Sequence, residues 1–470
     1  MRSTAGWRLG HSRIVLSGCG KWKAARGFAA SNPEEQESRE SGVAICMAEN
    51  VKASTAKAGS TALTSPGFVI PFITVTALFF VFGFITNLNM ALVPHLKRLF
   101  TLPYGLAMLA ESAFFLAYFV FSSPTSKLIE AIGYKRTMVV SLFIQVVGCL
   151  LFVPAAKMVS FPLFLTAVFV VGAGITALQT AANPYVSILG PESTAPIRLT
   201  LAQALNSLGG TLAPLVAGAF ILADKGTTQS QAAIANMVRG PYIAIAAALL
   251  LLGLAVAFSH LPPVIATQEF RPGKELDALM ARSILSYRHT VLGAVGIFLY
   301  VGVEVGLASI AVNYFKTQGM SSLETASFLV SLYWGGALVG RLLGAGILTR
   351  VKSGMLVGVF GVAAAALITT SMFTSGSVAI WTLVLCGFFN SIMFPNIFTL
   401  GIFGLGPMTS KGSGLIMTAV VGGAVIPWAL GALADQVGIQ HAFVIPLICY
   451  LYIAFYGFWG SKPAKAAVSS

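Results

Sequence analysis

Charged residues are scarce in this sequence. Only 9% of the 470 residues are Asp, Glu, Lys or Arg, whereas 56% are hydrophobic and the mean hydropathy is +0.84. Soluble domains carry about 25% charged residues, so a fully water-exposed surface is excluded and lipid must be the solvent. The net charge of +14 therefore fits positively charged loops beside lipid headgroups, and no nucleic-acid partner is expected.

Motifs for metal binding, disulfide formation and catalysis are also absent. The five cysteines lie far apart, and none has the C-x-x-C spacing of a metal or redox site. None of the five histidines is paired with a plausible acid or thiol, and no phosphate-binding loop occurs. We therefore predict that the chain is not an enzyme and uses no metal or other cofactor.

The first 67 residues differ from the rest in composition. They contain no apolar run of the roughly 7–15 residues that form a signal-peptide core. They are rich in Ala, Ser, Thr, Lys and Glu, which is typical of disorder. We predict a disordered cytoplasmic tail at 1–67, in which Met47 is an alternative start that would leave 1–46 outside the native protein.

From about residue 68 onward, apolar stretches of roughly 20 residues recur, each long enough to cross a bilayer. They predict twelve transmembrane helices, near 68–93, 105–130, 134–157, 161–189, 198–223, 240–260, 289–315, 322–349, 351–375, 378–406, 412–435 and 440–460. We therefore predict an all-α membrane protein with a six-helix bundle at 68–260, a cytoplasmic linker at 261–288, a second six-helix bundle at 289–460 and a cytoplasmic tail at 461–470.

The loop charges indicate the orientation. With both termini in the cytoplasm, eleven Lys and Arg residues fall in inside loops and six in outside loops. This bias favours cytoplasmic termini, although Lys97 and Arg98 lie on the outer side. We expect a multi-pass protein of the cytoplasmic (inner) membrane that is in contact with the lipid bilayer.

The two halves of the membrane region repeat a motif. GGTLAPLVAGA at 209–219 and GGAVIPWALGA at 422–432 both read G-G-x-x-x-P-x-x-x-G-A, with an offset of 213 residues. Pro184 and Pro395 repeat at an offset of 211, and Tyr118 and Tyr333 at 215. Such offsets predict two six-helix bundles related by a pseudo-twofold axis, which can rock around a central site and give alternating access.

Polar side chains inside the predicted helices need a reason, because burying them costs free energy. They gather in six of the twelve helices, and the candidates are Asn87, Asn89, Gln179, Asn183, Gln203, Asn206, Glu304, Tyr333, Trp334, Asn390 and Asn396. Amides and aromatic rings suit a ligand with many hydroxyl groups. The alternative is that single amides bond neighbouring helices; for the whole set we favour a cavity.

Two carboxyl groups lie well inside the predicted helices, Glu111 and Glu304. A carboxyl in a medium of low dielectric constant can exchange a proton near neutral pH, which is the chemistry of a proton symporter. Glu304 could instead pair with Arg341, which is itself a candidate gate residue. At the turn after the second helix, Glu130, Lys135 and Arg136 form either a solvated basic loop or a charged latch that holds one conformation closed.

Several long motifs are more specific: ITNLNMALVPHLK, KLIEAIGYKR, LQTAANPYVSILGPE, RLTLAQALNSLGGTLAPL and FNSIMFPNIFTLGI. They resemble the bacterial fucose–glucose/galactose sugar:cation symporter family of the major facilitator superfamily, over about 70–460. The resemblance implies twelve helices in the major facilitator fold, a central sugar site, and proton-driven uptake of hexoses or deoxyhexoses. Some members of the family resemble carriers of acetylamino sugars.

The resemblance also implies roles for single residues. The amides that match the family's motifs and would line a sugar cavity are Asn87, Asn89, Asn183, Gln203 and Asn206. Gln179 stands where fucose carriers have a membrane glutamate and glucose/galactose carriers have glutamine. Glu304 matches the glucose/galactose branch, and Phe394 takes the place of an aromatic residue in the tenth helix.

Met90 departs from the family, which usually has a proton-coupling aspartate at this position. The family usually has glutamine at the position of Glu111, so we predict that the proton site moved to Glu111, with Glu304 as the alternative. The predicted function is proton-coupled uptake of a hexose-type sugar (glucose, galactose, fucose or an acetylamino sugar) by a monomer. The alternative is a facilitator or exchanger of sugars or other neutral polyols without proton coupling.

Overall fold

The structure of the chain is a computed structural model that describes residues 63–64, 66–90, 92–101, 109–221, 230–261, 283–320 and 323–463. Met47 and nearly all of the predicted tail 1–67 lie outside the described residues. So do most of the predicted linker 261–288 and of the tail 461–470.

All regular structure in the described ranges is helical. The first half contains η1 Pro66–Phe68, α3 Val69–Met90, α4 Leu92–Phe100, α6 Leu109–Lys157, α7 Phe161–Ile188, η2 Glu192–Thr194, α8 Ala195–Val216, η3 Ala217–Ile221, α9 Gln231–Asn236 and α10 Arg239–Phe258. The second half contains η4 Ile284–Ser286, α12 Arg288–Thr317, α13 Leu323–Ile347, α14 Ser353–Phe373, α15 Gly376–Asn390, α16 Met393–Ile402, η5 Gly406–Met408, α17 Thr409–Thr418, η6 Ala419–Val421, α18 Gly422–Val437, α19 Ile439–Ala442, α20 Val444–Phe455 and η7 Tyr456–Gly460.

Ten helical segments in the described residues are long and apolar enough to cross a membrane. One of them, α6, consists of two helices joined at Gly133, whose φ of 80° lies in the left-handed region that glycine tolerates best. This joint falls in the gap between the predicted helices 105–130 and 134–157. α8 occupies the predicted helix at 198–223. The sequence predicts twelve spans. The two that are not counted separately among the ten segments are the second helix of α6 and the helix α8.

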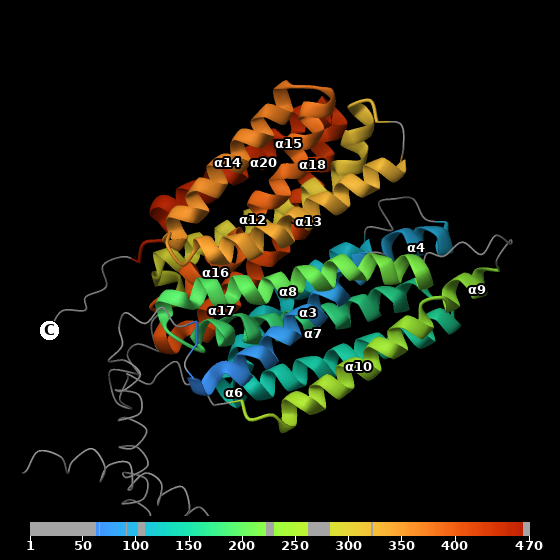
Figure 1. Ribbon diagram of the computed structural model, residues 1–470. Coiled ribbons are helices and arrows are strands. Elements are labelled where there is room, and N and C mark those ends of the chain that lie inside the picture. The colour runs from blue at the N-terminus through green and yellow to red at the C-terminus, as the bar shows by residue number, and fades with distance from the viewer. Residues whose placement is uncertain are drawn as a thin grey trace, which may run out of the picture. The chain divides into compact units, whose positions relative to one another are not determined.

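The helices form two bundles, as Figure 1 shows by colour from blue to yellow-green and from yellow to red. In the first, α6 packs against α7 and α10, and α3 against α8. In the second, α12 packs against α18, α13 against α15, and α14 against α20. The bundles meet where α17 contacts α6 and α7, and where α13 and α16 contact α8. Large apolar side chains such as Phe258 and Phe373 are exposed on the outside, as a lipid solvent requires.

The duplicated motif explains the closest helix packing in each bundle. A Cβ atom on Gly209 of α8 would collide with the backbone oxygen of Phe80 in α3. A Cβ atom on Gly422 of α18 would collide with the backbone oxygen of Phe298 in α12. The same glycine of each copy therefore lets two helices approach at backbone distance. Of these four helices, α8 contacts α13 and α16 of the second bundle, and α18 contacts α6 of the first.

The sequence predicts a single helix at 378–406, but the structure divides it at Ser391 and Ile392 into α15 and α16. Pro395 explains the break, because it has no N–H to donate to the backbone oxygen of Ser391 four residues earlier. The predicted helix 412–435 is also divided, into α17, η6 and α18.

Candidate functional site

A cavity of about 860 Å3, which includes its open side, lies between the two bundles. The first bundle lines it with four predicted amides, Asn87, Gln179, Gln203 and Asn206. The second bundle contributes four more predicted residues, Glu304, Trp334, Arg341 and Phe394. The structure thus brings eight of the sequence candidates to one hollow, and they come from α3, α7 and α8 on one side and from α12, α13 and α16 on the other.

The amides keep a free acceptor for a ligand. The side-chain nitrogen of Asn87 donates to the backbone oxygen of Gly83 at 3.0 Å, and that of Gln179 to the hydroxyl of Tyr118 at 2.8 Å. The nitrogen of Asn206 donates to the backbone oxygen of Phe79 at 3.4 Å. Because each bond uses the amide nitrogen, the side-chain oxygens are left to accept hydrogen bonds from hydroxyl groups.

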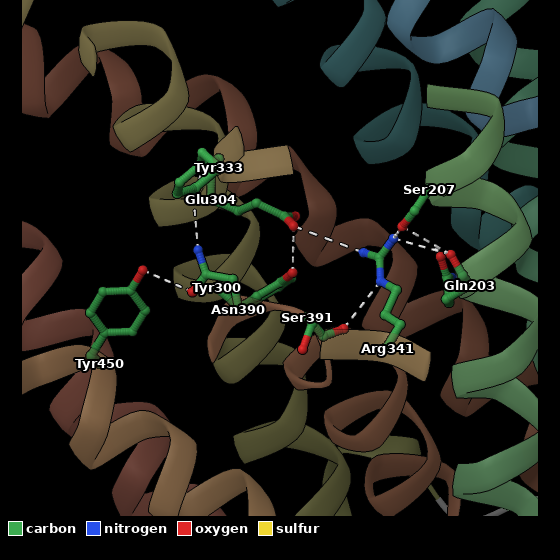
Figure 2. Close-up of polar contacts among 9 residues, drawn as sticks. All are labelled: Gln203, Ser207, Tyr300, Glu304, Tyr333, Arg341, Asn390, Ser391 and Tyr450. Carbon is green, nitrogen blue, oxygen red and sulfur yellow. Dashed lines mark hydrogen bonds and ion pairs between the residues drawn. The ribbon is translucent and has the colours of Figure 1, made fainter. Parts of the chain in front are cut away.

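Glu304 and Arg341 form an ion pair beside these amides, with 3.9 Å between Oε1 and Nη2. The hydroxyl of Tyr300 also donates to Glu304 Oε1, at 2.6 Å. Figure 2 shows the carboxylate between the tyrosine and the guanidinium. Both charged groups are nearly buried, so each needs the other to offset its desolvation.

Arg341 also joins the two bundles. Its Nη1 donates to the backbone oxygen of Gln203 in α8 at 3.1 Å and to the hydroxyl of Ser207. Its Nε donates to the backbone oxygen of Ser391 at 3.1 Å. That oxygen is the one that Pro395 leaves without a helical donor. Pro395 therefore leaves the backbone oxygen of Ser391 free to accept from Arg341. This bond holds the guanidinium of Arg341 toward α8 (Figure 2).

Tyr333 and Asn390 lie behind the cavity rather than on its wall. The hydroxyl of Tyr333 donates to the backbone oxygen of Glu304 at 3.2 Å, and Asn390 donates to that hydroxyl at 2.7 Å. The hydroxyl of Tyr450 donates to Asn390 Oδ1 at 2.8 Å (Figure 2). This buried chain satisfies Asn390 within the second bundle and supports the turn of α12 that carries Glu304.

Three further predicted amides do not line the cavity either. Asn89 accepts a hydrogen bond from Tyr242 at 2.7 Å, inside the first bundle. Asn396 accepts one from Ser353 at 2.7 Å, inside the second. Asn183 lies one turn beyond Gln179, where its nitrogen contacts the sulfur of Met417 at 3.4 Å. These amides join helices, which is the alternative that the sequence left open for single residues.

The two proton-site candidates lie in different places. Glu304 lines the cavity, whereas Glu111 lies in the first turn of α6, is half-buried and does not line it. Met90, at which the family resemblance implies an aspartate, does line the cavity. A carboxyl at position 90 would have faced the same space as Glu304.

The two bundles are bonded to each other on one side of the cavity. Ser410 donates to Glu130 at 2.9 Å, and the backbone nitrogen of Gly404 donates to Glu192 at 3.2 Å. The hydroxyl of Ser413 donates to the backbone oxygen of Thr180 at 2.8 Å. Pro184 leaves that oxygen without a helical donor, as Pro395 does in the other bundle.

The predicted latch at this end has other partners than the sequence suggested. Lys135 donates to the backbone oxygen of Ser259 at 2.8 Å, within the first bundle. Arg136 is exposed. Within the described ranges, neither forms an ion pair with Glu130, whose bond to Ser410 crosses to the second bundle instead.

Several cavity residues were not among the sequence candidates: Phe82, Thr86, Phe115, Tyr118, Ser207, Gly210 and Thr211. Tyr118 was noted only for its repeat, although its bond to Gln179 makes it part of the wall. Ser207 and Thr211 follow Gln203 at four-residue spacing, so they share its helix face. That spacing was the available signal.

Within the described residues, no group of His, Cys, Asp and Glu side chains could hold a metal ion.

Residues 74–426 match the family described as the Major Facilitator Superfamily. The chain belongs to the major facilitator superfamily. This membership confirms the predicted major facilitator fold and makes the chain a multi-pass membrane transporter rather than an enzyme.

Relatives within the superfamily are also similar over most of their length. The chain is 47% identical over 389 residues to the glucose/galactose transporter of Brucella abortus biovar 1 (strain 9-941), which covers 82% of this chain and 93% of that protein. It is 31% identical to the L-fucose-proton symporter of Escherichia coli (strain K12), over 85% of this chain and 95% of the symporter. Among solved structures, the superfamily transporter FucP in its outward conformation matches with a TM-score of 0.76 and 30% identity, over 84% of this chain and 99% of that one.

Proposed function

We propose that the protein is a secondary active transporter that takes up a hexose-type sugar together with a proton by alternating access. The observation that carries this proposal is the composition of the cavity between the bundles. Amides of one bundle face an ion pair and the aromatic residues Trp334 and Phe394 of the other. Such a wall can bond many hydroxyl groups and cover the apolar face of a sugar ring.

The relatives support the same substrate class. A protein that is 47% identical is named as a glucose/galactose transporter, and one that is 31% identical as an L-fucose-proton symporter. The substrate we favour is glucose or galactose, with fucose and acetylamino sugars as the other members of the class.

We assign the proton to Glu304 rather than to Glu111. Glu304 faces the cavity, and its ion-pair partner Arg341 also bonds the backbone of Gln203 in the other bundle. A change in the charge of Glu304 therefore affects both the cavity and the contact between the bundles. Protonation would leave the buried guanidinium without its counter-ion, which costs free energy. That cost falls if the bundles part and water reaches Arg341, so protonation favours their separation. The groups that face Glu304 are Arg341, Tyr300 and Tyr333.

Met90 favours a second candidate function, a facilitator or exchanger of sugars without proton coupling. Methionine cannot titrate, and Met90 lines the cavity at the position where the family usually has aspartate. If Glu304 serves only as the counter-ion of Arg341, no proton would accompany the sugar.

We also propose the orientation and assembly. The end bonded by Glu130, Glu192 and Ser413 is cytoplasmic, the cavity faces the outside, and both termini are cytoplasmic in the inner membrane. The likeness to FucP in its outward conformation supports this arrangement, as does the greater number of basic residues in the predicted inside loops. We expect the monomer to be the transporting unit, because the cavity is built from one chain.

The test is uptake of labelled sugars into proteoliposomes, with glucose, galactose, fucose and acetylglucosamine each measured with and without an inward proton gradient. We expect saturable uptake of glucose or galactose that accumulates above equilibrium only with the gradient. Equal entry with and without the gradient would favour the facilitator, and the absence of saturable uptake of every sugar would overturn the substrate class.

A further inference from the structure

A second cavity lies in the second bundle, apart from the central one. Its volume, which includes its open side, is about 640 Å3, and it is lined by Arg288, Phe455, Trp459, Gly460 and Lys462. α12 begins at Arg288, and η7, which follows α20, ends at Gly460. The cavity therefore lies where two adjacent membrane helices reach the level of the lipid headgroups.

The walls of this second cavity are held in place by bonds between the two helices. The hydroxyl of Tyr452 donates to the backbone oxygen of Leu292 at 3.0 Å, and that of Tyr456 to the backbone oxygen of His289 at 3.2 Å. A Cβ atom on Gly460 would contact the side chain of Leu292 at 3.4 Å. The start of α12 and the end of η7 thus form one packed unit, and the hollow between them is part of the fold.

Two cations face this hollow, and no described acidic side chain pairs with either of them. Arg288 and Lys462 are exposed, and within the described residues neither side chain forms a hydrogen bond or an ion pair. None of the described residues that line the cavity is acidic. α12 is a 30-residue helix that starts at Arg288, so the positive end of its dipole adds to the field of the two side chains. The cavity therefore favours an anion.

The remaining wall is apolar and faces outward. Trp459 is 63% exposed and Phe455 38% exposed, and their ring centroids lie 6.4 Å apart with an angle of 31° between the ring planes. Tryptophan is enriched at the interface between a bilayer and water, where its ring contacts the upper part of the acyl chains. The ligand that matches this wall has an anionic head and an apolar body.

We propose that this cavity is a binding site for the phosphate group of an anionic phospholipid, such as phosphatidylglycerol. Arg288 offers a planar fork of N–H donors that matches phosphate oxygens, and Lys462 adds a second positive charge. Phe455 and Trp459 cover the start of an acyl chain. Free inorganic phosphate has the same charged group, but it has no apolar part that could contact the rings of Phe455 and Trp459.

The test uses lipids with brominated acyl chains, which quench tryptophan fluorescence on contact. The full-length protein is reconstituted in bilayers that contain brominated phosphatidylglycerol or brominated phosphatidylcholine. The contribution of Trp459 is obtained by difference from W459F, because the chain has six tryptophans. The ratio of the two quenching curves gives the preference for the anionic lipid at this site.

For the wild type we expect roughly a fivefold or larger preference for phosphatidylglycerol. R288Q/K462Q should reduce the ratio to about one, as expected if the two charges supply the preference. The matched control is R350Q/K352Q, which removes the same charge from exposed residues that do not line the cavity and should leave the ratio unchanged. Thermal unfolding in detergent shows that each variant is folded.

Three outcomes would overturn the proposal. One is equal quenching by the two lipids in the wild type. Another is a preference for phosphatidylglycerol that remains in R288Q/K462Q, or that is lost to the same extent in the control R350Q/K352Q. The third is displacement of the lipid by millimolar inorganic phosphate, which would assign the site to a soluble anion instead of a headgroup.

Discussion

Arg341 in the second bundle donates to the backbone oxygen of Gln203 in the first, 3.1 Å away. The same guanidinium pairs with Glu304 at the cavity wall. One buried cation therefore links the charge of a carboxyl group to the contact between the bundles. In a symporter, a link of this kind makes the movement of the bundles depend on the bound proton.

Replacing Arg341 tests the role of this cation in holding the bundles together. Arg341→Gln removes the bonds to Gln203 and Ser207 and leaves Glu304 buried without its counter-ion. We expect a loss of about 3 kcal/mol in stability and loss of transport, measured by thermal unfolding in detergent and by sugar uptake. The control is Arg350→Gln, which changes an exposed arginine. Wild-type stability of Arg341→Gln would contradict the role of the bridge.

Glu304→Gln separates sugar movement from proton coupling. Glutamine can still accept from Tyr300 but cannot titrate, so we expect the variant to exchange labelled for unlabelled sugar while losing accumulation driven by a proton gradient. The matched variant is Glu111→Gln, which changes the carboxyl outside the cavity wall and should keep gradient-driven accumulation. If instead Glu111→Gln abolishes coupling and Glu304→Gln keeps it, the proton site is Glu111.

Asn87 and Asn89 differ only in the face of α3 on which they lie. Asn87→Ala removes a side-chain oxygen from the cavity, so we expect sugar affinity to fall about tenfold, the effect of one lost hydrogen bond. Asn89→Ala breaks a bond to Tyr242 inside the bundle and should lower stability by about 1 kcal/mol with little change in affinity. Binding isotherms and unfolding curves for both variants check this division. The reverse pattern would place the site elsewhere.

The repeated glycines should be equally intolerant of substitution. Gly209→Ala and Gly422→Ala each place a methyl group against a backbone oxygen of the neighbouring helix, so we expect each to destabilise the protein by about 2 kcal/mol. Gly431→Ala, which meets nothing within 4 Å, should be neutral or stabilising by up to about 1 kcal/mol. Thermal unfolding of the three variants measures the difference. A Gly422→Ala protein as stable as Gly431→Ala would contradict the packing of α18 on α12.

Helix positions and the duplication were predictable, because long apolar stretches and a repeated motif can be read directly from the sequence. The breaks within the membrane helices were less predictable from the sequence. Pro395 signals an interruption, but only the structure shows that the oxygen it frees, on Ser391, is used by Arg341. Similarly, Pro184 frees an oxygen of Thr180 that Ser413 of the other bundle bonds.

The cavity residues were predictable only in part. Asn87 and Asn89 lie about 200° apart around one helix, so helical geometry already allows only one of them to face the cavity. Asn390 and Asn396 could not be sorted this way, because their partners Tyr450 and Ser353 come from helices distant in sequence. Which amide joins helices and which faces a ligand depends on tertiary contacts that a single sequence does not specify.

The claim that the cavity opens to each side in turn is tested most directly by locking the closed end. In a cysteine-free background, Glu130→Cys and Ser410→Cys place two thiols where α6 and α17 touch, and a short thiol-specific cross-linker joins them. We predict that the cross-linked protein still binds glucose or galactose but transports neither, and that a cleavable linker restores uptake when cut. Normal uptake by the fully cross-linked protein would contradict alternating access between these bundles.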